Sequence, residues 1–389
     1  MRFETSAVPA ISRRTCLIGL AAVALGPAQA RSAGFEHWVA AFRPRALARG
    51  ISEATYDRVM SAVTPDTSVY AAVRAQPEFT ELMWQYINRR CSDWRVITGK
   101  ERAKEYAHLL GRIEADSGVD RYILLGLWGM ESSYGDVIVN RKYMRPVIPA
   151  LAALAYGEPR RRRYWEAELL NALTIVDRGW ARPTDMIGSW AGAMGHTQWM
   201  PEVWLHMGVD FDRDGRINPF GKPDDALAGT AHYLAVRGRY RRGEIWGCEV
   251  MLPEGGERLA NGSGWRTYAQ WHASGLRRAD GAAFARLDDR TRLWVPVAGG
   301  PAFLIGQNFY AVRSYNPSMS YTLALCHLGD LIRGGPPFHR QFPGGERVPT
   351  LAEVKAIQRR LNERGFKTDG VDGRTGSDTL LAVLAFEKK

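Results

Sequence analysis

Apolar residues recur every three or four positions along most of the chain, and this spacing predicts amphipathic α-helices. The pattern covers 35–335 and is clear at 101–118 and 163–177, while Ser52 stands where a helix N-cap is expected. The stretch 252–297 is richer in Gly, Trp, Val and Thr, which predicts short strands or irregular structure. The chain as a whole is therefore predicted to be mainly α, with one region of mixed structure.

The helical pattern is interrupted near the C-terminus. Residues 336–347 are rich in proline and glycine and predict a linker. Over 348–389 apolar residues return at helical spacing, together with the loop Asp-Gly-Arg-Thr-Gly at 372–376. This combination resembles the peptidoglycan-binding domain type 1, which implies a small helical wall-binding domain. The alternative is a helical tail that packs on the main domain.

Residues 1–30 have the pattern of an export signal peptide. The pair Arg13 and Arg14 precedes an apolar run, and small residues near Ala30 provide a cleavage point. The stretch resembles a twin-arginine signal, with Cys16 where Phe is usual. Because no later segment has the ~18 uninterrupted apolar residues of a membrane helix, we expect an exported periplasmic protein, soluble or wall-associated, without stable membrane insertion once the signal is removed. A retained N-terminal anchor is the alternative.

The formal net charge of +11 favours an anionic partner, such as nucleic acid, acidic lipid or cell wall. The arginines are scattered, and the one dense run is 160–163, so we do not expect nucleic acid to be the partner. Cys91, Cys248 and Cys326 follow the predicted signal without metal-ligand spacing. They are compatible with one disulfide or with three free thiols, and nothing supports a cysteine nucleophile.

One segment, 123–135, ends an apolar helical run in a single carboxylate, Glu131. On a helix, Leu124, Leu127 and Trp128 lie on the same face as this residue. A carboxyl group pressed against leucine and tryptophan is costly to ionise, so we expect its pKa to rise. That is the state of a general acid, the kind of group that protonates a glycosidic oxygen. The alternative is a helix-end glutamate paired with an arginine.

A second segment, 189–201, mixes small, polar and aromatic residues. Its Gly and Ala residues permit close approach of the backbone, and Ser189 and Gln198 offer polar groups beside rings that stack on sugars. A tightly packed glycine-rich turn is the alternative. Taken together and in order, E-S-S-Y-G and A-G-A-M-G-x-x-Q-x-M-P resemble the lytic murein transglycosylase B family of bacterial cell-wall enzymes, whose fold is lysozyme-like.

The stretch 210–217 begins like a calcium-binding loop, with the pattern D-x-D-x-D-G. Carboxylates at alternate positions converge on one cation, but Gly221 stands where an EF-hand has its bidentate Glu. The resemblance implies a longer EF-hand-like loop closed by a later Asp, and so one structural Ca²⁺, with a metal-free turn as the alternative. The candidate ligands are Asp210, Asp212, Asp214, Arg216 through its carbonyl group, and either Asp224 or Asp225.

The resemblance also implies which residues line the glycan cleft. From its residues alone, 308–321 predicts a β-like or irregular segment, a turn at Asn-Pro and then a helix. The family places the Y-N-x-S-x-x-Y motif within this stretch beside the catalytic cleft. Carried over residue by residue, the expected glycan contacts are Ser189, Gln198, Tyr233, Tyr315, Asn316 and Tyr321.

The function implied by the resemblance is that of a lytic transglycosylase with a lysozyme-like catalytic domain over 35–335. Such an enzyme cleaves the MurNAc–GlcNAc β-1,4 bond of peptidoglycan without water and leaves 1,6-anhydromuramic ends, with Glu131 as acid and base and with no catalytic cofactor. A hydrolytic muramidase is one alternative; it needs a second carboxylate, and Asp136 is the nearest in sequence. A non-catalytic wall-binding protein is another, but it would have no need of the acid.

Overall fold

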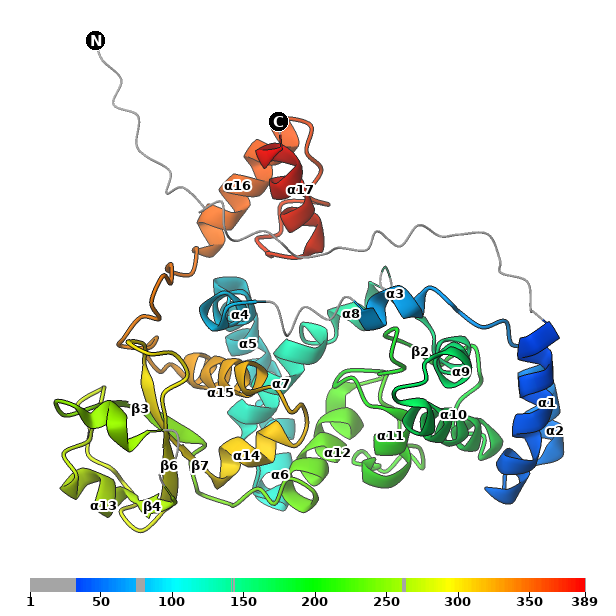
Figure 1. The fold of residues 1–389 in the computed structure, drawn as a ribbon, viewed down its shortest axis with the longest axis horizontal. Helices are drawn as coiled ribbons and strands as arrows, with labels where there is room; N and C mark the ends of the chain where they lie inside the picture. The colour runs from blue at the N-terminus through cyan, green and yellow to red at the C-terminus, as the bar shows by residue number, and fades with distance from the viewer. Residues whose placement is uncertain (1–32, 75–80, 141, 143, 261–263, 389) are drawn as a thin grey trace.

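The computed structural model describes residues 33–74, 81–140, 142, 144–260 and 264–388. The predicted export signal lies outside the described residues. The described part is mostly helical, and Figure 1 shows its helices in two groups, with a small sheet and a separate pair of C-terminal helices beside them. Within this part, no helix combines the length and the apolar character that crossing a membrane requires.

One hydrophobic core is built around α7 (Arg121–Ser132) and α15 (Met319–Arg333). α7 buries nine of its twelve residues and α15 ten of its fifteen, so both helices lie inside the protein. They approach closely because each presents a glycine to the other: a Cβ on Gly126 would lie 2.6 Å from the Leu325 carbonyl oxygen. The other helices of this group are α4 (Met83–Arg90), α5 (Asp93–Glu105), α6 (Ala107–Ser117), α8 (Asp136–Val139), α12 (Pro223–Val236) and α14 (Gln307–Arg313).

A second core surrounds α9 (Val147–Gly157) and α10 (Arg162–Asp177), which bury eight of eleven and nine of sixteen residues. The glycine-rich segment, residues 189–201, belongs to this core but also contacts the first group. Its Trp199 Nε1 donates a hydrogen bond of 2.9 Å to Thr230 Oγ1 on α12. The remaining elements here are α1 (Ala33–Ala48), α2 (Glu53–Ala62), α3 (Val69–Arg74), α11 (Pro201–Met207), β1 (Arg145–Pro146) and β2 (Ile187–Gly188).

The region of predicted mixed structure contains three strands of a five-stranded antiparallel sheet. The elements of the sheet and of its connections are β3 (Gly247–Met251), η3 (Gly256–Leu259), β4 (Arg266–Thr267), α13 (Tyr268–Ala273), β5 (Arg277–Arg278), β6 (Arg290–Trp294) and β7 (Ala302–Gly306). The strand order is β4-β6-β7-β3-β5, and β6 pairs with β7 so that Leu293 lies opposite Leu304. Both leucines belong to a small third core beside Trp271. The sheet extends beyond the predicted region at both ends.

Two elements differ from the sequence prediction. The periodicity over 101–118 is continuous, but the helix breaks at Tyr106, which has φ −104° and ψ 22°. Its ring packs edge-on against Trp128 with centroids 5.5 Å apart, so a tertiary contact overrides local propensity. The β-like or irregular structure predicted at 308–313 is wrong, because these residues belong to α14. There the buried Asn308 side chain bonds three backbone groups of another loop.

The C-terminal helices α16 (Leu351–Glu363) and α17 (Ser377–Glu387) form their own small unit, here called the C-terminal module. Gln358 lies between them and is fully buried. Its Nε2 donates to Asp372 Oδ1 at 2.8 Å and to a threonine hydroxyl on α17 at 3.0 Å. This side chain therefore ties the Asp-Gly-Arg-Thr-Gly loop to both helices.

The three cysteines of the described part, Cys91, Cys248 and Cys326, are buried free thiols. Burial raises the pKa of Cys91 and of Cys248 to about 12, so both stay protonated at neutral pH. Of the two states that the sequence leaves open, the structure has the three free thiols.

Candidate active site

Glu131 lies in the last turn of α7, next to the apolar face predicted from the sequence. Leu124, Leu127 and Trp128 on that face are at most 2% exposed, and Glu131 itself is partly buried. The Tyr321 hydroxyl, in the first turn of α15, donates a hydrogen bond to Glu131 Oε1. A residue distant in sequence thus holds the carboxyl group in a fixed orientation.

Tyr321 belongs to a group of tyrosines beside Glu131. Burial and the negative charge of Glu131 raise the pKa of Tyr321 and of Tyr315 well above the ordinary value, so both hydroxyls remain donors. Tyr315 donates to the Thr197 carbonyl oxygen in the glycine-rich segment. The Tyr233 ring on α12 packs edge-on against Tyr315 with centroids 5.2 Å apart. These contacts gather three of the predicted site tyrosines around one carboxyl group.

The chain leaves α7 through a left-handed turn. Ser133, Tyr134 and Gly135 have φ values of 51°, 60° and 90°, and the first two are costly for residues with side chains. Arg95 on α5 supports this turn: its Nε donates to the Gly129 carbonyl at 2.9 Å, and its own carbonyl accepts from the Tyr134 hydroxyl at 2.8 Å. The sequence gives no signal for Arg95, because it lies outside every motif and acts on a distant part of the chain.

His196 connects α7 to the glycine-rich segment. Trp128 Nε1 donates to its Nδ1 at 3.1 Å, and its Nε2 donates to the Gly221 carbonyl at 2.8 Å. Because Nδ1 accepts, the imidazole is neutral, and burial lowers the pKa of His196 accordingly. A Cβ on Gly135 would lie 2.8 Å from this ring. The histidine therefore sets how closely the turn after Glu131 approaches the facing segment.

Gln198 lies at a cavity between the glycine-rich segment and α8. The lining residues are Val137, Ile138, Met144, Ile187, Gly195, Gln198 and Phe220. Gln198 is itself in the left-handed region, with φ 54°, and its Nε2 donates to the Gly195 carbonyl at 3.0 Å. Its placement on the cavity wall is compatible with the glycan contact predicted from the sequence.

Two other predicted contacts, Ser189 and Asn316, have side chains that stabilise their own turns. Ser189 Oγ accepts from the backbone amides of Ala191 and Ala193 at 3.3 and 3.1 Å. Asn316 Oδ1 accepts from the Ser318 amide at 3.1 Å. Their hydrogen bonds within the structure thus shape the loops of the site.

Asp136, the carboxylate nearest to Glu131 along the sequence, is paired with Arg374 of the C-terminal module. Nη1 and Nη2 of the arginine donate to the two carboxylate oxygens at 2.6 and 3.1 Å. Both side chains are about one third exposed. The pair therefore occupies both oxygens of Asp136 at the start of α8.

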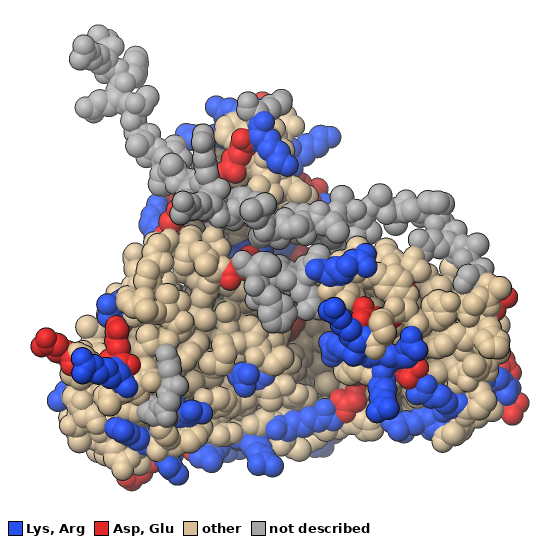
Figure 2. All heavy atoms as spheres, viewed as in Figure 1, with Lys and Arg blue, Asp and Glu red and all other residues tan. Residues whose placement is uncertain are grey.

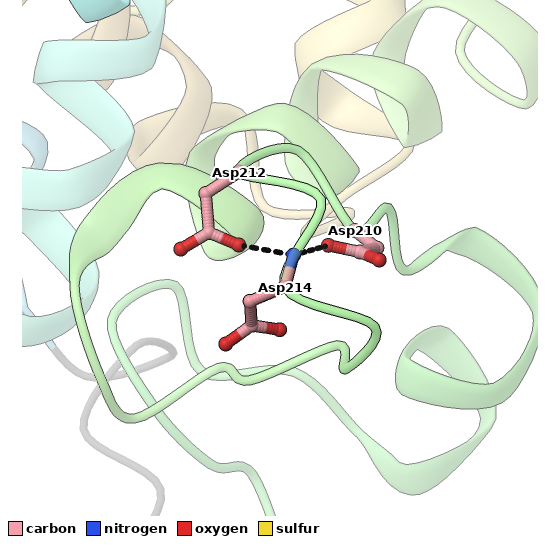
Figure 3. A group of neighbouring side chains, drawn as sticks. All are labelled: Asp210, Asp212 and Asp214. Carbon is pink, nitrogen blue, oxygen red and sulfur yellow. Dashed lines mark hydrogen bonds between the residues drawn. The ribbon is translucent and has the colours of Figure 1, made fainter.

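The acidic loop brings three predicted ligands together. Single carboxylate oxygens of Asp210, Asp212 and Asp214 all lie within 4.8 Å of one another. Figure 3 shows the amide of Asp214 between the other two carboxylates, to which it donates at 3.1 Å each. Exposed carboxylate oxygens at this spacing fit a hard cation such as Ca²⁺.

The later aspartates take different positions. Asp225 is buried and closes the loop by accepting from the amides of Phe211 and Asn218 at 2.8 and 2.9 Å. Asp224 lies in the first turn of α12, where its Oδ1 accepts from the amide of Asp225 at 3.2 Å. The Arg216 amide donates to Asp214 Oδ1 at 2.8 Å. Asp225 thus ties the ends of the loop together through backbone hydrogen bonds.

A carboxyl group at the end of a buried helix, held by a tyrosine hydroxyl beside further tyrosine rings, matches the single-acid arrangement of enzymes that cleave glycans. Comparison with known families narrows this class. The chain matches the transglycosylase SLT domain family over residues 34–330 and the putative peptidoglycan binding domain family over 350–389. It therefore belongs to the SLT family of lytic transglycosylases, which confirms the resemblance found in the sequence and the mainly α, lysozyme-like fold.

Individual relatives agree with this assignment. The chain is 29% identical over 280 residues to membrane-bound lytic murein transglycosylase B of Escherichia coli, covering 71% of this chain and 73% of that protein. The structure of SltB3 from Pseudomonas aeruginosa in complex with NAG-anhNAM-pentapeptide is 38% identical, with a TM-score of 0.74 over 92% of this chain and 95% of that one. Escherichia coli Slt35 in complex with calcium is 25% identical, with a TM-score of 0.63 over 78% and 94%.

Proposed function

We propose that this lytic transglycosylase cleaves the β-1,4 bond between MurNAc and GlcNAc in peptidoglycan and leaves 1,6-anhydromuramic ends, with Glu131 as acid and then as base. The observation that carries the proposal is the Glu131 carboxyl group at the end of a buried helix, oriented by the Tyr321 hydroxyl. Such a group is a proton donor placed among rings that stack on sugars.

The reaction needs one carboxyl group. Glu131 first gives its proton to the glycosidic oxygen as the bond from that oxygen to C1 of MurNAc breaks. The C6 hydroxyl of the same sugar then attacks C1, and the Glu131 carboxylate takes the proton of that hydroxyl. No water is consumed, and the acid is restored. Because its pKa lies well above the ordinary value, the Tyr321 hydroxyl stays protonated and stabilises the carboxylate between the two steps.

A hydrolytic muramidase of the inverting type would need a second carboxylate about 6.5–9.5 Å from the acid to activate water. Asp136 is the nearest in sequence, but Arg374 binds both of its oxygens, which leaves them little freedom to take a proton from water. The pairing supports the transglycosylase over the muramidase. A relative solved with NAG-anhNAM-pentapeptide supports the same choice.

The glycan contacts follow from the positions of the side chains. Gln198 lies at the cavity wall, while Tyr233 and Tyr315 present rings close to Glu131. In our proposal these three contact the sugar, as do Ser189 and Asn316, whose side-chain oxygens also hold the neighbouring turns in shape. Aromatic faces and amide groups together match the alternating apolar and hydroxyl surfaces of a glycan.

The acidic loop is proposed to hold one structural Ca²⁺. Asp210, Asp212 and Asp214 would supply carboxylate oxygens and Arg216 its carbonyl group, with the loop closed by Asp225. The calcium complex of Slt35 supports this assignment. Such an ion offsets the repulsion among the carboxylates and stiffens the loop ahead of α12.

The proposed setting is the periplasm, where residues 1–30 would act as the export signal and residues 348–389 would bind the wall. Basic side chains are scattered over the face shown in Figure 2 and gather at its right side and along its lower edge, in keeping with the net charge of +11 and with an anionic polymer as partner. The match of the C-terminal module to a peptidoglycan binding family supports the same partner.

The decisive test is mass spectrometry of the soluble products after the purified protein digests peptidoglycan. Muropeptides with anhydromuramic ends, lighter by one water than reducing-end products, are expected. Reducing ends would show a muramidase, and a second carboxylate would then be required. Wall binding without any product would instead indicate a non-catalytic protein.

A further inference from the structure

α8 forms part of the cavity wall and is only partly buried. Val137 and Ile138 line the cavity that Gln198 lines from the facing segment. None of the four residues of α8 is buried, and Val139 is 88% exposed. A helix of this length has little stability of its own. Contacts made at its two ends therefore contribute to its position.

Arg374 of the C-terminal module binds the first end. Its guanidinium donates to both oxygens of Asp136, and its Cζ lies 4.2 Å from the ring centroid of Trp94 on α5. The Arg374 carbonyl accepts from Nε2 of the buried Gln358 at 3.1 Å. The arginine is thus fixed to the module core through its backbone and to α5 through its side chain, and it holds α8 from this position.

Lys142 provides the second contact, three residues beyond the end of α8. Its Nζ lies 3.1 Å from Asp369 Oδ2 and 2.8 Å from Asp378 Oδ1, both in the C-terminal module. The module is also attached to α5, because the Leu351 amide donates to Asp93 Oδ2 at 2.8 Å. The module therefore contacts the chain both before and after the two residues of α8 that line the cavity.

We infer that Arg374 is a positioning residue for the substrate cleft: through its ion pair with Asp136, the C-terminal module holds α8 in place as one wall of the glycan site. The inference rests on the proposed function only in taking this cavity as part of the glycan site. A module on a flexible tether would act differently, since it would raise the local concentration of wall and leave α8 unchanged. The two cases differ for a short soluble substrate, which gains nothing from wall attachment.

The test uses the full protein and a soluble tetrasaccharide fragment of peptidoglycan. Arg374→Ala and Asp136→Asn are each expected to raise KM about two- to fivefold, the upper part of the range for a partly exposed ion pair, with kcat within about twofold. Arg359→Ala is the matched control, because this exposed arginine of α16 forms no ion pair with a described residue. An unchanged KM in both variants would show that the module is only a tether.

Reversal of the pair separates positioning from direct contact with the sugar. Asp136→Arg combined with Arg374→Asp should return KM to within about twofold of the wild type, because the attraction is restored with the charges exchanged. If Arg374 touched the glycan itself, the double variant would stay impaired, and the inference would be overturned. A fall in kcat with unchanged KM in Asp136→Asn would place Asp136 in the chemistry and would overturn it too.

A binding measurement keeps this inference distinct from the proposed reaction. The tetrasaccharide is titrated calorimetrically into Glu131→Gln, with and without Arg374→Ala. A two- to fivefold weaker affinity in the double variant supports positioning even if no anhydromuramic product is ever found. Equal affinities would overturn the positioning role while leaving the proposed reaction intact.

Discussion

Carboxyl groups at the end of α7 and in the loop before α12 have contrasting surroundings. Glu131 lies against buried leucines and a tryptophan and accepts a hydrogen bond from Tyr321. Asp210, Asp212 and Asp214 instead lie together with partial or full exposure to solvent. An apolar surrounding favours a carboxyl group that gives and takes a proton, whereas clustering in water favours carboxylates that stay charged around a cation. The surroundings decide the chemistry of the same functional group.

Replacement of the acid should have the largest effect. Glu131→Gln keeps the shape of the side chain but cannot donate the proton, so kcat should fall at least about 10³-fold while the melting temperature and wall binding are retained. Anhydromuropeptide release measures the rate, and Glu101→Gln, an exposed glutamate of α5, is the matched control. Near-normal activity of Glu131→Gln would refute the assignment of the acid.

Removal of the Tyr321 hydroxyl should have the next largest effect. Tyr321→Phe preserves the ring but deletes the donor to Glu131, so the carboxylate formed during the reaction loses a hydrogen bond. We expect kcat to fall about 10- to 100-fold with little change in KM. If KM rose instead and kcat stayed constant, Tyr321 would be a sugar contact and not a partner of the acid.

The acidic loop should respond to chelation in stability and not in chemistry. At the proposed calcium site, removal of the ion would leave three carboxylates repelling one another, so a chelator should lower the melting temperature of the protein by about 3–6 °C. Asp212→Asn should melt earlier and show no further shift with chelator. A wild-type melting temperature that is indifferent to chelator would argue for a metal-free turn.

Glu168 on α10 is a buried carboxyl group that lies in neither of these two places, and it shows what burial does to a carboxyl group without catalysis. Burial raises its pKa to about 7, and its Oε2 accepts from the Glu202 amide at 3.0 Å. The folded state therefore binds this proton more tightly than the unfolded state. The resulting stabilisation is complete below about pH 4.5 and is lost as the pH rises through 7.

Glu168→Gln should remove that dependence. Between pH 5 and 8 the free energy of unfolding should decline by about 1–2 kcal/mol less in the variant than in the wild type, as measured by denaturant titration. Glu36→Gln is the control, because Glu36 lies on the exposed side of α1. Its free energy of unfolding should decline with pH as that of the wild type does. If the free energy of unfolding changed equally with pH in all three proteins, Glu168 would bind its proton no more tightly in the folded state than in the unfolded state.

The sequence was sufficient to predict features that depend on neighbours along the chain. The apolar face beside Glu131 follows from helical spacing, and the Asp cluster follows from alternate positions in one loop. Family resemblance added Tyr321 as a site residue but not its hydrogen bond to the acid. Each of these predictions rests on residues that are close together in the sequence, either within a turn or two of a helix or within one motif.

Features that depend on distant contacts could not be predicted. The break at Tyr106 arises from its packing on Trp128, and Arg95 supports the turn after Glu131 from another helix. Arg374 and Asp136 meet across 238 positions, and neither residue carries a local signal for the other. Periodicity reports which face of an element is buried, but not which element covers it.

The left-handed turn after Glu131 limits how this enzyme can evolve. Glycine would relieve the backbone cost at Tyr134, but its buried ring fills the space next to Gly99 and Gly129, where a Cβ would lie 2.5–2.6 Å from the tyrosine. Glycine in its place would leave a cavity, and a side chain at either glycine would displace the ring. Glycine at position 134 and a side chain at position 99 or 129 should therefore each destabilise this turn. The turn next to Glu131 is therefore constrained by side-chain packing at three positions at once, so a change at one of them disturbs its fit to the other two.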